Sequence, residues 1–169
     1  MALSIKAGDI KKGDPDLKAM KAKIDKITKQ LQQGSQVVVG LPSESQPYPD
    51  GTSVLSVGFW NEFGTKHIPE RPFLRETLRQ QRQEWVALSE KLYAQAIESG
   101  VDPQTLLGVL GEQMQIDVQK NIDSGAWEPN APAYARAKEK AGKTKPLIVT
   151  GHLRGSIRYV VRDRSDGDS

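Results

Sequence analysis

The chain has 169 residues, a mean hydropathy of −0.55 and a formal net charge of +3, which suits one domain with a sizeable core, with or without an appended arm. It contains no cysteine, so a disulfide, a cysteine-ligated zinc site and a thiol nucleophile are excluded. The N-terminus lacks the apolar core of a signal peptide, and no apolar run approaches the length that spans a bilayer. We therefore expect a soluble protein made in the cytoplasm, with no membrane partner.

The first predicted element is an amphipathic helix over residues 14–34, preceded by a flexible N-terminal arm at 1–13. Asp14 suits the cap of this helix, Pro15 its first turn and Gly34 its end. Apolar residues spaced by three and four positions form one stripe along it, made of Leu17, Met20, Ile24, Ile27 and Leu31. This stripe has to meet either the rest of the domain or a neighbouring chain.

A strand, a loop and a helix follow. The β-branched run over 35–41 predicts a buried strand, and the proline-rich stretch 42–51 predicts a mobile loop. Periodicity is ambiguous over 52–64, but we favour a helix with Thr52 or Ser53 as its cap and Gly64 as its end. The positions that fit helical spacing are Val54, Leu55, Gly58, Phe59, Glu62 and Phe63.

Two long helices joined by a short break form the next predicted unit, a helical hairpin. The first begins at Pro72, ends at 99–100 and has an apolar face of Leu74, Leu78, Trp85, Leu88, Leu92 and Ala96. The second is bounded by Asp102, Pro103 and Gly125, and its stripe is Leu107, Leu110, Met114, Val118 and Ile122. Gly108 and Gly111 lower the helix propensity here, which indicates close approach to a packed neighbour.

The C-terminal third contains a loop over 126–134, a short basic helix and tail over 133–145, and a single turn through Leu153 that Thr150 could cap. Alternating residues then predict a strand over 157–162, before a disordered tail at 164–169. The overall pattern predicts an α+β fold in a single domain over 14–163. We expect a small antiparallel sheet packed with the two long helices and the shorter ones.

Positive charge is concentrated in this last third, where nine Lys and Arg between Asn130 and Arg164 stand against two acids. Such an excess can attract phosphates or an acidic protein surface, or it can be a solvated face. Tyr134 and Tyr159 could stack on bases, but no known nucleic-acid-binding motif accompanies them. Nucleic-acid binding is therefore the alternative function, and the candidate basic patch is Arg136, Lys138, Lys140, Lys143, Lys145, Arg154 and Arg158.

Candidates for catalysis are few, because His67 and His152 are the only histidines and no G-x-S-x-G motif is present. Glu62 and the two histidines could hold a divalent ion, but no histidine spacing typical of a metal site supports this. A metal-dependent hydrolase is thus the weakest hypothesis. The segment 141–145, "AGKTK", has Ala137 where a phosphate-binding loop needs glycine. We expect no enzymatic activity, no metal and no cofactor.

A stiff joint is predicted at "NEFGTKHIPERPFLR", residues 61–75, because each proline imposes extended geometry on the residue before it. Stiff apolar residues beside arginines are typical of the energetic centre of a protein interface. The interface candidates are Phe63, His67, Pro69, Arg71, Phe73 and Arg75. Core packing is the main alternative for Phe63 and Phe73, and an ion pair within or between subunits is expected for Arg71 and Arg75.

Two distant stretches resemble the virion-morphogenesis proteins of tailed phages, also called tail-completion or minor tail proteins of the neck. They are "SVGFWNEFGTKHIPERPFLRETL" at 56–78 and "WEPNAPAYARAKEKAGKTKPLIVTGHLRGSIRYVV" at 127–161. With the helices between them, the resemblance covers most of 37–161. Val149 departs from the family pattern, which commonly has aspartate there.

The resemblance implies a structural role in the virion without a chemical reaction. Proteins of this family complete the tail or join it to the head at the neck, often as a ring of subunits. The implied partners are copies of this chain, with a hexamer as the expected ring, and other neck and tail proteins such as the tail terminator, the connector and the tail tube. Contact with DNA is a further possibility. The implied location is the virion, after assembly in the host cytoplasm.

Overall fold

The computed structural model describes residues 36–99, 101–130 and 151–162, together with isolated positions 15, 18, 19, 21, 22, 24, 25, 28, 29, 136, 146 and 147. The predicted N-terminal arm and helix, the basic helix over 133–145, the proposed cap at Thr150 and the C-terminal tail lie outside the continuous stretches.

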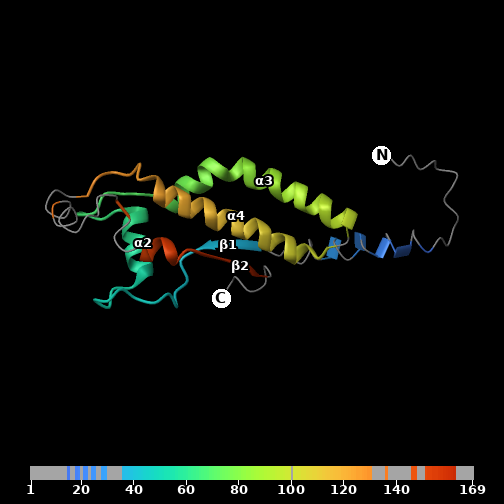
Figure 1. The fold of residues 1–169 in the computed structure, drawn as a ribbon, viewed down its shortest axis with the longest axis horizontal. Helices are drawn as coiled ribbons and strands as arrows, with labels where there is room; N and C mark the ends of the chain where they lie inside the picture. The colour runs from blue at the N-terminus through green and yellow to red at the C-terminus, as the bar shows by residue number, and fades with distance from the viewer. Residues whose placement is uncertain are drawn as a thin grey trace.

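The fold is α+β, as the sequence predicts, with two strands and several helices. The elements are β1 (Gln36–Gly40), α2 (Val54–Phe63), α3 (Phe73–Ser99), α4 (Pro103–Ser124), α6 (His152–Gly155) and β2 (Arg158–Arg162). Figure 1 shows α3 and α4 side by side along the molecule, with the sheet next to α4 and α2 across one end beside α6.

The sheet is an antiparallel pair in which Gln36 lies opposite Arg162 and Gly40 opposite Arg158. Side chains alternate between its faces, so Val37 and Val39 pack toward the helices while Val38 lies on the outer face. Val38 and its cross-strand partner Val160 are 37% and 52% exposed. The prediction of a buried first strand is therefore wrong in part, because the described helices cover only one face of the sheet.

The predicted helical hairpin is confirmed at its boundaries and in its core. Asp102 caps α4, its Oδ2 accepting a hydrogen bond of 3.1 Å from the backbone N of Gln104, and Gly125 ends the helix with a φ of 68°. Trp85 extends across the hairpin and donates from Nε1 to Asp117 Oδ2 over 2.9 Å. The first core cluster comprises Trp85, Leu92, Ala96, Leu106, Leu107 and Leu110.

One residue of the predicted α3 face is misplaced, since Leu78 is exposed and Thr77 takes the buried position. Thr77 Oγ1 donates to the carbonyl oxygen of Phe73 over 2.6 Å and accepts from Asn121 Nδ2 over 2.8 Å. These bonds satisfy a hydroxyl that would otherwise be buried without a partner. The start of α3 therefore turns Phe73 and Thr77 toward α4.

The two glycines inside α4 both face Tyr159 of β2. A Cβ on Gly111 would overlap the Tyr159 ring, whereas a Cβ on Gly108 would lie 3.9 Å from the Tyr159 hydroxyl. The predicted close approach to a packed neighbour is thus confirmed at Gly111. Gln115, one turn further along α4, accepts a hydrogen bond of 3.1 Å from the backbone N of Tyr159.

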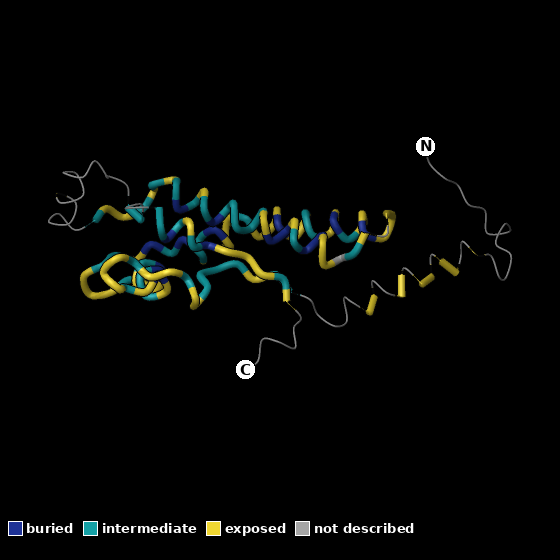
Figure 2. Tube along the Cα trace, turned by 60° about the horizontal axis from the view of Figure 1, so that its bottom comes forward, coloured by how far each residue is buried: buried dark blue, intermediate teal, exposed yellow. Residues whose placement is uncertain are grey.

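A second core cluster joins α2, α3, α4 and α6 at the end of the hairpin. It comprises Val54, Phe73, Val118, Ile122, Leu153 and Ile157. Figure 2 shows buried residues recurring along the two long helices, among intermediate and exposed ones. Gly64 ends α2 as predicted, with a φ of 72°, and Ser53 occupies its N-cap without a side-chain hydrogen bond. The N-cap of α6 is Gly151.

The loop over 42–51 has hydrogen bonds of its own. The backbone N of Tyr48 donates to Thr52 O over 2.9 Å, and the backbone N of Thr52 donates to Asp50 Oδ1 over 2.9 Å. Its expected mobility stays a prediction. Among the helices that the structure describes, none has both the length and the apolar composition needed to cross a membrane.

Candidate subunit interface

Glu62, at the end of α2, binds the beginning of α3. Its Oε2 accepts from the backbone N of Leu74 over 2.9 Å, and its Oε1 accepts from the backbone N of Arg75 over 3.0 Å. The first N–H groups of a helix have no partner within it and carry partial positive charge, so a buried carboxylate is well placed there. Glu62 therefore acts as an N-terminal cap supplied by another helix, and it fixes α2 relative to α3.

Arg71 is buried at the centre of the joint. Its Nε donates to Glu128 O over 2.8 Å, and Nη2 donates to Pro129 O and to Asn130 Oδ1, each over 3.1 Å. Nη1 donates to Asn61 Oδ1 over 3.0 Å. Arg71 thus ties the joint to the segment after α4. Its predicted place in an interface is corrected to a position inside the subunit.

The other interface candidates divide by exposure. Phe73 is fully buried, so it belongs to the core rather than to a docking surface. His67 is exposed in a turn where Thr65 Oγ1 accepts from the backbone N of His67 over 3.2 Å and of Ile68 over 3.0 Å. Pro69 is half-buried, and Phe63 and Arg75 are exposed. Core packing, expected as the main alternative for both phenylalanines, holds for Phe73 and fails for Phe63.

A row of large apolar side chains is exposed on α2. Leu55, Phe59 and Phe63 recur every four residues and are 47%, 57% and 54% exposed, with Trp60 beside them at 40%. We call Leu55, Phe59, Trp60 and Phe63 the α2 aromatic face. The sequence pattern grouped three of these residues with Val54, Gly58 and Glu62, but the structure buries only the latter three. Trp60 was not among the residues expected.

Arg75 borders the α2 aromatic face and is held in place on two sides. Its guanidinium lies 4.8 Å from the centre of the Phe63 ring, and the Phe59 and Phe63 ring centres are 4.7 Å apart. Its Nη2 contacts Glu70 Oε1 at 2.5 Å and its Nε contacts Glu62 Oε1 at 3.1 Å. The hydrogen bonds to Glu70 and then to Glu62 raise the pKa of Arg75. The predicted ion pair of Arg75 is therefore present within the subunit.

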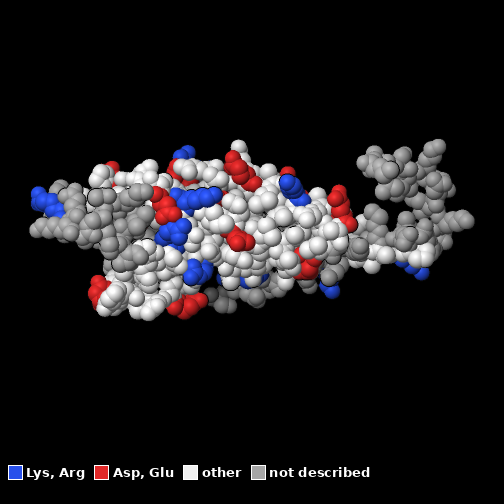
Figure 3. Space-filling model, viewed as in Figure 1, with Lys and Arg blue, Asp and Glu red and all other residues white. Residues whose placement is uncertain are grey.

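Two arginines of the candidate basic patch, Arg154 and Arg158, bind other groups of the chain. Arg154 Nε lies 2.7 Å from Asp123 Oδ2, and Arg158 Nη1 donates to the carbonyl oxygens of Gly155 and Ile157. Arg136 is exposed, and the patch lysines at 138, 140, 143 and 145 lie outside the described residues. Figure 3 shows acidic and basic side chains interspersed on the face in view.

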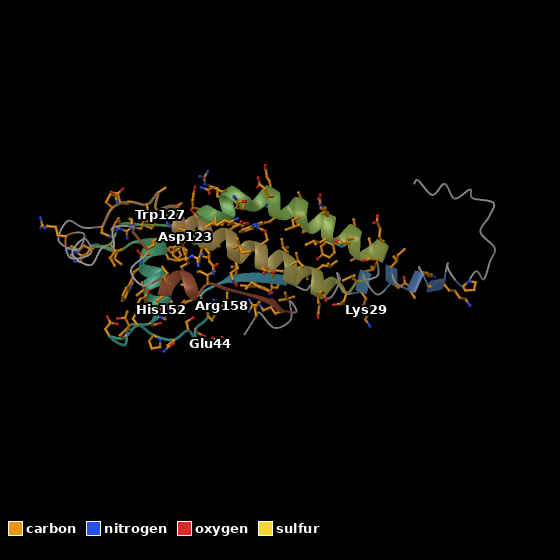
Figure 4. The ribbon with its side chains drawn as sticks, in the orientation of Figure 1. Lys29, Glu44, Asp123, Trp127, His152 and Arg158 are labelled. Atoms are coloured by element: carbon orange, nitrogen blue, oxygen red, sulfur yellow. The ribbon has the colours of Figure 1, made fainter. Side chains whose placement is uncertain are left out.

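A hollow of about 510 Å³ lies between the loop after β1 and α6, lined by Glu44, His152 and Arg158 among others. Figure 4 labels these three side chains, which come from the loop, α6 and β2. His152 Nε2 lies 2.6 Å from the carbonyl oxygen of Gln46, and its ring meets the Tyr48 ring edge-on. His152 therefore holds the loop against α6.

Two serines in the loop after β1 form local hydrogen bonds. Ser45 Oγ donates to Pro42 O over 2.7 Å, and Ser43 Oγ donates to Glu44 Oε2 over 3.1 Å. The Glu62 carboxylate faces the start of α3. Within the described ranges, no group of three or more His, Asp or Glu side chains is placed to hold a metal ion.

Comparison of the chain with models of known protein families, with curated proteins and with solved structures gave no match. The geometry of the α2 aromatic face is therefore the principal guide to function, beside the resemblance carried by the two sequence stretches.

Proposed function

We propose that this chain is a structural protein of a tailed-phage virion, which completes the tail or joins it to the head at the neck as a ring of subunits. The observation that carries the proposal is the α2 aromatic face, which the chain leaves exposed beside a fixed arginine. Monomeric proteins rarely expose adjoining large apolar side chains, and such patches mark interaction sites.

The composition of this face suits a protein partner. Aromatic residues and arginine dominate the energetic centres of interfaces, because they bury much area at a low cost in side-chain entropy. Burying a large apolar side chain is worth about 1.5–3 kcal/mol, part of which is offset by the loss of rotational and translational freedom on association. Arg75, already held by Glu62 and Glu70, loses little further freedom when a partner covers it.

The rigid joint beneath the face supports a ring. A closed ring requires the same rotation between every pair of neighbours, so the docking surface has to keep a constant angle to the rest of the subunit. Glu62 fixes α2 to the start of α3, and Arg71 fixes the joint to the segment after α4. Copies that dock on the α2 aromatic face would thus all have the same orientation relative to their neighbour.

The test is to replace Phe59 and Phe63 together by aspartate and to measure the mass of the assembly by native mass spectrometry, for the protein alone and mixed with purified phage tails. We expect the double variant to lose ring formation or tail binding. The matched control replaces Val86 and Ile97 of α3 by aspartate. These residues are 50% and 47% exposed but lie outside the face, so this variant should assemble as the wild type does. Wild-type assembly by the Phe59 and Phe63 variant would refute the proposed role of the face.

The nucleic-acid alternative is separated by a second measurement on the same protein. If the chain instead binds DNA through its basic third, binding of a DNA fragment should weaken steeply with added salt and be lost on replacing Arg136, Lys138 and Lys140. The Phe59 and Phe63 variant would then bind DNA as the wild type does.

A further inference from the structure

The first strand, β1, has an edge whose backbone groups have no hydrogen-bond partner among the described residues. Tyr159 donates its backbone N–H to Gln115 rather than to β1, so this N–H points away from the partner strand. Because backbone groups alternate in direction along a strand, Val38 and Val160 form a hydrogen-bonded pair, and the N–H and C=O groups of Val37 and Val39 point away from β2. No hydrogen bond from the described residues reaches those groups.

The two edges of the sheet differ in protection. On β2, Gln115 occupies the edge at Tyr159, and Arg158 and Arg162 add charge at both ends of the strand. On β1 the sequence from Gln36 to Gly40 has no charge and no proline. Charged side chains, prolines and covering groups are the usual means by which a sheet edge avoids pairing. The edge of β1 has none of them among the described residues.

We propose that β1 pairs antiparallel with β1 of a second copy, around a twofold axis that passes beside Val38. In this register Val37 of one copy lies opposite Val39 of the other, and each such pair exchanges both of its N–H···O bonds. Val38 then faces its own counterpart across the axis. The product is a continuous sheet in the order β2–β1–β1–β2, with the helices of both copies on one face and Val38 and Val160 on the other.

A second copy suits this edge better than the other strand of the chain. A strand added here needs apolar residues at the two inward positions and no charge near the junction, which Val37, Val39 and the uncharged ends of β1 supply. Pairing of β1 with β2 of another copy would have to displace Gln115. Pairing of two β2 strands around Val160 would oppose Arg158 and Arg162 of different copies, and like charges opposed across strands are destabilising.

The test uses charge at Val38, because its exposed side chain can be replaced without altering the core. In the paired sheet the two Val38 Cα atoms lie about 4.5 Å apart. We expect Val38→Lys alone and Val38→Glu alone each to weaken the dimer at least about tenfold, a loss of about 1.4 kcal/mol, measured by sedimentation over a concentration series. An equimolar mixture of the two variants should recover a dimer of mixed composition.

The control places the same charges at Val160, which shares the outer face and lies directly opposite Val38 on β2. In the paired sheet the two Val160 residues are three strand spacings apart, about 14 Å, so Val160→Lys and Val160→Glu should leave the dimer near its wild-type strength. Circular dichroism verifies that all four variants fold.

Three results would overturn the pairing. They are a wild-type protein that stays monomeric at every concentration, an equal effect at Val38 and Val160, or no recovery in the mixture. The Phe59 and Phe63 variant should keep this twofold contact, because the α2 aromatic face is a separate surface. Loss of the ring and loss of the dimer are therefore distinguishable.

Discussion

At the scale of single residues, Gly111 is the position where adding a single methyl group should have the clearest effect on stability. Gly111→Ala gains about 1 kcal/mol of helix propensity, but the new Cβ overlaps the base of the Tyr159 ring, which can yield only by changing its rotamer. Overpacking of this kind costs about 1–3 kcal/mol. We expect a net loss of about 1 kcal/mol in the free energy of unfolding, measured by urea denaturation.

Gly108→Ala is the matched control, since its Cβ would have ordinary contact with Tyr159 at 3.9 Å. This variant should be more stable than the wild type by about 0.5–1 kcal/mol. Equal stabilisation by the two alanines would show that Tyr159 does not restrict position 111.

Glu76, in the first turn of α3, provides a pH-dependent signal. Hydrogen bonds from Arg79 and then from Gln80 lower the pKa of Glu76 from 4.5 to about 2. A carboxylate with a lowered folded-state pKa stabilises the fold above its unfolded pKa, and this contribution is lost as the pH falls from about 4.5 through about 2. The NMR titration of the Glu76 side-chain carboxyl should thus have its midpoint near pH 2.

Replacing Arg79 by glutamine should move that midpoint back toward 4.5, since it removes the largest cause of the lowered pKa. Because Glu76 is at the surface, global stability should change little. A midpoint that stays in place in the Arg79→Gln variant would mean that the pair does not form in solution.

At the scale of elements, the joint depends on Arg71. Lysine at this position keeps the charge but has one ammonium group in place of the planar fork that contacts Asn61, Glu128, Pro129 and Asn130. These part-buried acceptors would lose their donors, at up to about 1–3 kcal/mol each where water cannot replace them. We expect Arg71→Lys to lower the free energy of unfolding by about 2–4 kcal/mol.

Hydrogen exchange should locate that effect, with faster exchange at the end of α2 and over 126–130. Arg82→Lys, an exposed substitution in the middle of α3, is the control and should change stability by less than about 0.5 kcal/mol. Indistinguishable stabilities for the Arg71 and Arg82 variants would contradict the role assigned to Arg71.

At the scale of the whole molecule, the residues that stabilise the fold and those proposed for assembly are separate. Phe59→Ser with Phe63→Ser should lower the free energy of unfolding of the subunit by about 1 kcal/mol or less, mainly through the lost contact of Arg75 with Phe63. Phe73→Ala should lower it by about 3–5 kcal/mol, because Phe73 is fully buried. Thermal denaturation of the subunit compares the two. A large loss in the serine variant would place these rings in the core.

Local signals in the sequence were sufficient to predict α2, α3 and α4 and their ends to within about a residue. Asp102, Pro103 and Gly125 bound α4 by capping chemistry that acts within a few residues, and the spacing of Leu107, Leu110, Val118 and Ile122 identifies its buried face. The β-branched run at 36–40 was recognisable as a strand for the same reason.

The buried side of α2 could not be predicted, because both candidate sides fit helical spacing and the more apolar one is exposed. Gly58 faces inward because it leaves room for Leu41, and Glu62 faces inward because it caps α3. Both reasons depend on residues brought in from other elements. The contacts of Arg71 were equally hidden, since a sequence pattern does not show which distant carbonyl groups will meet a guanidinium.

Three side-chain hydrogen bonds of Arg71 join residues 57 to 59 positions apart, with the whole helical hairpin between them. Because the chain is made from its N-terminus, α2 and the start of α3 are synthesised before their partners at 128–130. The Arg71 contacts that tie the joint to the segment after α4 can therefore form only after α4 has been completed. A nascent chain interrupted before that point would expose the α2 aromatic face without the Arg71 contacts. The proposed docking surface should therefore reach its final orientation only when the subunit is almost fully synthesised.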